Sequence, residues 1–96
     1  MDATLIYETG IIVAQVIRPL SNTISVLTPS NVYGAKVVLV HNRGNQYEIV
    51  NVTHANNVLI GNIPIEHGTY HFLQKDSDDK VSGNNIVAVS IAWPKG

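Results

Sequence analysis

The chain has 96 residues, a formal net charge of −1, 45% hydrophobic and 14% charged residues, and no cysteine. A chain of this length supports one core, so we expect a single domain over residues 1–96. Its high hydrophobic fraction excludes a disordered chain. Its charged fraction is below the roughly 25% of an average globular protein, so we expect some apolar surface to meet a partner. Six basic residues without a basic run exclude the footprint of nucleic-acid binding, and the missing cysteines exclude disulfides, thiolate metal sites and thiol nucleophiles.

The N-terminal part predicts two strands. Residues 3–8 and 11–18 are rich in β-branched side chains, with Gly10 between them and Pro19 after the second. The second run is far too short to span a bilayer, and the chain start lacks the basic residues of a secretory signal. We expect no membrane segment and no signal peptide.

The second of these runs is apolar on both faces of a strand, because Gln15 is its one polar residue between 11 and 17. A strand in a two-layer sandwich needs only one apolar face, so the other face requires a cover. We expect another subunit to provide it, with Ile11, Val13 and Ile17 as the candidate interface. A central strand that is buried on both faces within one chain is the alternative.

Three further strands are expected between residues 22 and 53. Residues 22–28 alternate in polarity, and a loop rich in turn residues follows. Residues 35–42 and 46–53 flank a short connection that contains Gly44. We expect these two strands to pair as a hairpin.

A corner over residues 62–72 joins the next two strands. Pro64 cannot donate to a β ladder and should end the first strand, and Gly68 supplies a φ value that is costly for other residues. Tyr70 and Phe72 lie two apart and share one face of the second strand. We expect this aromatic face to be buried in the core.

The order acidic-x-Gly-x-Tyr-x-hydrophobe, carried by Glu66, Gly68, Tyr70 and Phe72, resembles the turn between strands E and F of immunoglobulin-like domains. The resemblance implies a structural corner in which the Tyr70 hydroxyl hydrogen-bonds back across the turn. Antibody-type domains are excluded, because the chain has no cysteine and its one tryptophan is Trp93, near the C-terminus.

A polar loop over residues 76–83 precedes the last strand, residues 86–93. Large and small residues alternate along this strand, and we expect the large ones to face the core: Val87, Val89, Ile91 and Trp93. About seven to eight short strands without helical periodicity predict an all-β, antiparallel, immunoglobulin-like β-sandwich. A barrel-like closure is the main alternative.

Candidate motifs for metal binding or catalysis fail on their spacing. His67 and His71 have the spacing of a helical metal pair, but residues four apart in a strand are roughly 13 Å distant. The acidic run 76–80 departs from the calcium-loop pattern, and the sequence contains no glycine-rich phosphate loop or nucleophile elbow. We expect no metal, no cofactor and no enzymatic activity.

A small cysteine-free β-sandwich with few charges resembles, in size, composition and fold type, the accessory proteins of phage particles, especially capsid decoration (cement) proteins and small tail components. The resemblance implies a structural protein of the virion, assembled in the host cytoplasm, that buries apolar surface on a lattice. It would act as a dimer or trimer bound to a larger assembly such as a capsid shell. The alternative is a carbohydrate- or protein-binding module of the adhesin kind, with Tyr7, Tyr33 and Tyr47 as candidates for stacking on a sugar.

Overall fold

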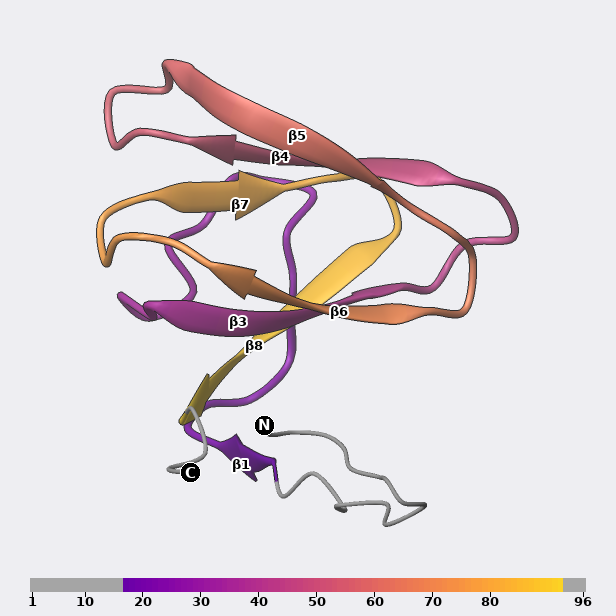
Figure 1. The fold of residues 1–96 in the computed structure, drawn as a ribbon, viewed down its shortest axis with the longest axis horizontal. Helices are drawn as coiled ribbons and strands as arrows, with labels where there is room; N and C mark the ends of the chain where they lie inside the picture. The colour runs from indigo at the N-terminus through magenta and orange to yellow at the C-terminus, as the bar shows by residue number, and fades with distance from the viewer. Residues whose placement is uncertain (1–16, 93–96) are drawn as a thin grey trace, which may run out of the picture.

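The computed structural model of the chain describes residues 17–92, which form eight β-strands and contain no helix. The strands are β1 (Arg18–Pro19), β2 (Ile24–Ser25), β3 (Val37–Asn42), β4 (Glu48–Thr53), β5 (Leu59–Ile65), β6 (Tyr70–Gln74), β7 (Lys80–Ser82) and β8 (Ile86–Ala92). They form two antiparallel sheets packed in two layers, with β4, β5 and β7 in one layer and β3, β6 and β8 in the other (Figure 1). The all-β sandwich predicted from the sequence is confirmed.

The strand order is that of a jelly roll. The larger sheet has the order β1-β8-β3-β6, with β2 also paired to β8, and the smaller sheet has the order β5-β4-β7. A single bridge between Ser30 and Val81 adds one more position beside β7. If β2 is counted as the first strand and the position of Ser30 as the second, β3 to β8 are the third to eighth strands. The larger sheet then has the order one-eight-three-six and the smaller sheet has the order two-seven-four-five, which is the double Greek key of a jelly roll. Immunoglobulin-like sandwiches instead place the last strand beside the one before it.

The connection between β3 and β4 crosses from one sheet to the other, so the predicted hairpin between residues 35–42 and 46–53 is wrong. β3 pairs with β6 and β8, whereas β4 pairs with β5 and β7. The physical reason is the buried side chain of Asn42 at the end of β3. Its Oδ1 accepts a 2.8 Å hydrogen bond from the Gly44 N–H, and its Nδ2 donates at 2.8 Å to the Gln46 carbonyl, which turns the chain out of the larger sheet.

The core lies between the two sheets and is mainly aliphatic. Its buried members are Val26, Val32, Ala35, Val38, Val40, Val50, Ile65, Val81, Ile86 and Ala88. They come from both sheets and from the segment that links β2 to β3. Because strand residues alternate in direction, each sheet sends one face into this core and turns the other outward.

The orientation of β8 is the reverse of the prediction. Ile86, Ala88 and Ser90 are buried, whereas Val87 and Val89 are only half-buried on the opposite face. The register explains this result, because Ala88 lies opposite the core residue Val40, and directly opposed residues in a ladder share a face. Ile91 is also buried, but by alternation it lies on the side of β8 that carries Val87 and Val89, and it is not part of the core cluster. Trp93 lies outside the described residues.

Two strand boundaries also differ from prediction. β5 continues through Pro64 to Ile65, because β5 is an edge strand and a proline can point its ring nitrogen away from the ladder. The polar loop predicted over residues 76–83 contains β7, in which Val81 is fully buried.

Candidate functional site

The side of the larger sheet that faces away from the core carries an apolar surface, which we name the outer face. It consists of alternate residues on β3, β6 and β8: Val37, Leu39, Phe72, Val87 and Val89. Leu39 lies opposite Phe72 on one side and opposite Val89 on the other. Opposed residues in a ladder have Cβ atoms about 4.5–5.5 Å apart, so these three side chains form a continuous apolar row.

No described strand covers the outer face. β4, β5 and β7 lie on the opposite side of the larger sheet (Figure 1). β1 and β2 pair edge to edge with β8. Leu39, Val87 and Val89 remain half-buried, and Phe72 is 36% exposed. The sandwich thus keeps an apolar sheet face outside its own core.

A stacked ring pair extends the outer face by one row. The rings of His41 and Tyr70 are 4.1 Å apart at an interplanar angle of 17°, and Val87 lies opposite His41 on the other side. His41 Nδ1 is 3.0 Å from the Thr69 carbonyl oxygen, which can only accept, so this nitrogen carries a proton. The ring is therefore held in one orientation, with Nε2 as its remaining polar atom.

The predicted burial of Tyr70 and Phe72 is wrong. Tyr70 is 62% exposed, and both rings point outward. β6 pairs with β3 in a register that places Tyr70 opposite His41 and Phe72 opposite Leu39, so the aromatic residues lie on the outer face. Among the described residues, the Tyr70 ring is held by stacking on His41 and not by the hydroxyl bond that the resemblance implied.

The turn before β6 has the predicted glycine. Gly68 has a φ of 73°, and its N–H donates to the Asn42 carbonyl at 2.9 Å. The Glu66 carbonyl accepts from the Thr69 hydroxyl at 2.7 Å, and the Glu66 carboxylate accepts from the Tyr47 hydroxyl at 3.0 Å. This last bond stabilises the protonated phenol and raises the pKa of Tyr47.

The predicted interface residues fall mostly outside the described part of the chain. Ile11 and Val13 are not described. Ile17 is the first described residue, directly precedes β1 and is 43% exposed.

Another exposed apolar run lies at the start of β5. Val58, Leu59 and Ile60 follow the turn of the β4–β5 hairpin, and each is about half exposed. This run belongs to the smaller sheet and is separate from the outer face.

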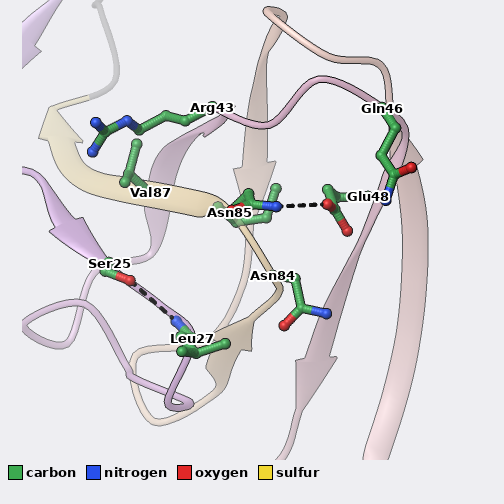
Figure 2. Close-up of a pocket in the computed structure, with 9 residues that line it drawn as sticks. Ser25, Leu27, Arg43, Gln46, Glu48, Asn84, Asn85 and Val87 are labelled. Atoms are coloured by element: carbon green, nitrogen blue, oxygen red, sulfur yellow. Dashed lines mark hydrogen bonds between the residues drawn. The ribbon is translucent and has the colours of Figure 1, made fainter.

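A groove of about 630 Å³ lies where the connection from β3 to β4 faces the turn before β8 (Figure 2). Its lining residues are Ser25, Leu27, Arg43, Gln46, Glu48, Asn84, Asn85, Ile86 and Val87. The Arg43 side chain extends past Val87, while Glu48 and Asn84 lie toward the other end (Figure 2). A second groove of about 310 Å³ shares Leu27, Glu48 and Asn84 with it.

Two hydrogen bonds fix the shape of the larger groove. Asn85 Nδ2 donates to Glu48 Oε2 at 2.8 Å, and the Arg43 N–H donates to the Asn85 carbonyl at 2.8 Å. Asn85 has a φ of 58°, a conformation that asparagine adopts more readily than most residues. The exposed guanidinium of Arg43 and the exposed amides of Gln46 and Asn84 can bind polar groups.

A buried lysine organises the loop between β6 and β7. Lys75 Nζ donates to the carbonyls of Asp76 at 3.1 Å and Ser77 at 3.4 Å. Burial lowers the pKa of Lys75, against the opposing effect of the charges on Asp79, Asp78 and Asp76. His54 Nδ1 lies 3.7 Å from Asp79 Oδ1 at the same loop.

Within residues 17–92, no group of three or more histidine and acidic side chains is arranged to hold a metal ion. The same residues include no helix that could cross a membrane. Comparisons of the chain with protein families, with curated proteins and with solved structures find no significant match. The fold and surfaces of residues 17–92 define an antiparallel β-sandwich of jelly-roll order with an apolar sheet face that no described strand covers.

Sequence reasoning did not single out Asn42 or the groove residues Arg43, Asn84 and Asn85. Ten asparagines are present, several at predicted turns, and this enrichment was the available signal. It does not show which asparagine is buried, because that depends on contacts with residues far along the chain.

Proposed function

We propose that the protein is a structural assembly protein, in particular a small accessory protein of a virus particle such as a capsid decoration protein. The observation that carries the proposal is the outer face, an apolar sheet surface that no described strand covers. Jelly-roll sandwiches are common among viral capsid domains, although they also occur in lectins, so the fold agrees with this class without deciding it.

The composition of the outer face suits protein contact. Its five residues and the adjoining His41–Tyr70 pair include no lysine, arginine, aspartate or glutamate. Interfaces differ from ordinary surface mainly by the loss of charge at their centre and by enrichment in aromatic residues. The proposed partner surface is therefore another apolar protein face.

The expected strength of one such contact is modest. The five side chains are already half-buried or more, so burying what remains exposed contributes about 1 kcal/mol each, or about 5 kcal/mol together. Association costs an estimated 4–15 kcal/mol, which offsets most of this gain. A face of this size acts best where several contacts form together, as on a repeating lattice.

The test is the mass of the protein in solution by light scattering, with variants of the outer face. Wild type should exceed the 10.4 kDa of a monomer, and Leu39→Lys should lower the mass while the circular dichroism spectrum stays unchanged. Val89→Thr keeps the β-branched shape and should weaken assembly less. The matched control Asn62→Lys changes an exposed residue of the smaller sheet and should not alter the mass. A wild-type chain that stays monomeric at high concentration would contradict the proposal.

A second candidate function is the binding of a polar ligand in the groove. Its volume lies within the roughly 300–1,000 Å³ of small-molecule sites, and Arg43, Gln46 and Asn84 offer hydrogen-bond donors. Tyr33 and Tyr47 are exposed but line neither groove, and Tyr7 is outside the described residues. A stacking platform for sugars is therefore not part of this site.

A glycan array probed with the whole chain tests this second candidate. A signal that Asn84→Ala removes and Asn62→Ala retains would favour a binding module over an assembly protein. No signal, together with an oligomeric mass, would favour the assembly function.

A further inference from the structure

We infer that protonation of His41 weakens the contact made through the outer face, so that the protein assembles at neutral pH and dissociates in mild acid. This inference rests on the proposed assembly function and adds its regulation. Three observations carry it: the place of His41 beside the outer face, the bond that fixes its ring, and the charges on the elements packed around it.

His41 lies on the same side of the larger sheet as the outer face. It stands two residues after Leu39 on β3, opposite Tyr70 on β6 and opposite Val87 on β8. Of the four histidines in the chain, His41 is half-buried, whereas the other three are exposed: His54, His67 and His71. His41 is therefore the histidine that a protein covering the outer face would meet within the apolar surface.

One ring nitrogen of His41 is protonated in both charge states. Nδ1 lies 3.0 Å from the Thr69 carbonyl oxygen, which only accepts, so Nδ1 donates from the neutral ring and from the charged ring alike. A proton taken up in acid must therefore bind Nε2. No residue between 17 and 92 hydrogen-bonds Nε2, and this atom is not enclosed by the protein, so water reaches it in a single copy. The charge of His41 is thus decided at an atom that a partner would cover.

The uncovered protein tolerates the charged ring better than a covered one. The ring stacks on Tyr70 at 4.1 Å and 17°, and a cation above an aromatic face is stabilised. Water can accept from the new N–H at Nε2. An apolar partner removes this water and offers no acceptor, and burying an unpaired charge costs far more than burying a neutral ring. A single copy therefore binds more protons than an assembled one, and the association constant falls as the pH falls.

The elements packed around His41 do not compensate its charge. β8 carries no titratable side chain. The other neighbouring elements carry these titratable or charged groups: Tyr70 and His71 on β6, Arg43 after β3, and Glu66 and His67 in the turn before β6. Arg43 extends past Val87, so a positive charge already lies on this side (Figure 2). The Glu66 carboxylate accepts from the Tyr47 hydroxyl at 3.0 Å, and no carboxylate of residues 17–92 forms an ion pair with His41.

Sedimentation equilibrium of the full chain in neutral and in mildly acidic buffer tests the inference. An ordinary histidine, which titrates near pH 6.5, is about ten parts charged to one part neutral at about pH 5.5. Between about pH 7.5 and 5.5 the association constant should therefore fall about tenfold for each His41 that the contact covers. Circular dichroism spectra recorded at both pH values show whether the chain stays folded.

Two substitutions at position 41 fix the charge in opposite ways. His41→Gln is neutral at both pH values and should stay associated at both. His41→Lys is charged at both and should associate weakly at both. His54→Gln, in the turn between β4 and β5, is the matched control and should keep the response of wild type.

The outcomes separate this inference from the proposed function. Equal association of wild type at both pH values, or stronger association in acid, would overturn the inference and leave the assembly function standing. A response that persists in His41→Gln would assign the titration to another group and would also overturn it. A wild-type chain that is monomeric at neutral pH would overturn both the inference and the proposed function.

Discussion

Asn42 Nδ2 donates a 2.8 Å hydrogen bond to the carbonyl of Ile65, and this bond joins the end of β3 in the larger sheet to the end of β5 in the smaller one. Asn42 and Ile65 are 23 residues apart and both fully buried. The backbone of Asn42 also exchanges hydrogen bonds with Gly68 and Thr69 in the turn after β5. One asparagine therefore ties together the two connections that pass between the sheets at this end of the sandwich.

Replacing Asn42 by alanine should destabilise the fold strongly. The change removes the partners of the Gly44 N–H and of the Gln46 and Ile65 carbonyls. Unsatisfied buried groups cost about 1–3 kcal/mol each, so we expect a loss of about 2–4 kcal/mol after water enters the site. Urea denaturation measures this loss. The exposed Asn45→Ala in the same connection is the matched control and should stay within about 0.5 kcal/mol of wild type.

Gly83→Ala should also destabilise the protein, for a steric reason. A Cβ atom at Gly83 would lie 2.7 Å from Ile86 Cγ1 and 2.8 Å from the Ile49 carbonyl oxygen. Overpacking of this kind costs about 1–3 kcal/mol, and thermal denaturation should show a lower melting temperature. Gly61→Ala is the control, because no atom lies within 4 Å of the added methyl group. Equal melting temperatures for the two variants would contradict this packing.

The buried Lys75 predicts a pH dependence of stability. Because burial lowers its pKa in the folded state, the folded chain binds fewer protons here than the unfolded chain at alkaline pH. Its contribution to stability therefore increases as the pH rises toward the ordinary lysine value of 10.5. Relative to Lys75→Met, wild type should gain free energy of unfolding over that interval, measured by urea titration. Lys36→Met, at an exposed position, is the control; a difference that falls with pH would refute the assignment.

Phe72→Ala should cost less free energy of unfolding than Ile65→Ala, although phenylalanine is the larger residue. Ile65 is fully buried in the core, and its truncation should cost about 2–5 kcal/mol. Phe72 lies on the outer face at 36% exposure, so its truncation creates no enclosed cavity. Chemical denaturation of both variants at a concentration where wild type is monomeric gives the comparison. A larger loss of free energy of unfolding for Phe72→Ala than for Ile65→Ala would show that Phe72 is buried in the core and would contradict its place on the outer face.

The sequence predicted which segments become strands better than it predicted how they pair. β-Branched runs located β3 and β4, but the short connection with Gly44 is compatible with a hairpin and with a crossing between sheets. The bond from Asn42 to Ile65 decides between them, and no local pattern encodes a contact over that separation. The class of fold follows from strand density alone, whereas strand order depends on such long-range contacts.

The predicted burial of Tyr70 and Phe72 was wrong for a related reason. Tyr70 and Phe72 share one face of β6, as alternation predicts, but alternation does not say which face meets the core. The pairing of β6 with β3 settles that question and turns both rings outward. The same argument reverses β8, where the small residues Ala88 and Ser90 lie inside and the valines lie outside.

Hydroxyl-radical footprinting across a range of protein concentrations tests most directly whether the outer face is buried on assembly. Tyr70, in the row that extends the outer face, and Tyr47, directly before β4, are equally exposed at 62%, so their oxidation rates form an internal comparison. We predict that oxidation of Tyr70 and Phe72 slows as the concentration rises and that oxidation of Tyr47 does not change. Constant rates for Tyr70 and Phe72 at every concentration, or protection of Tyr47 alone, would contradict assembly through the outer face.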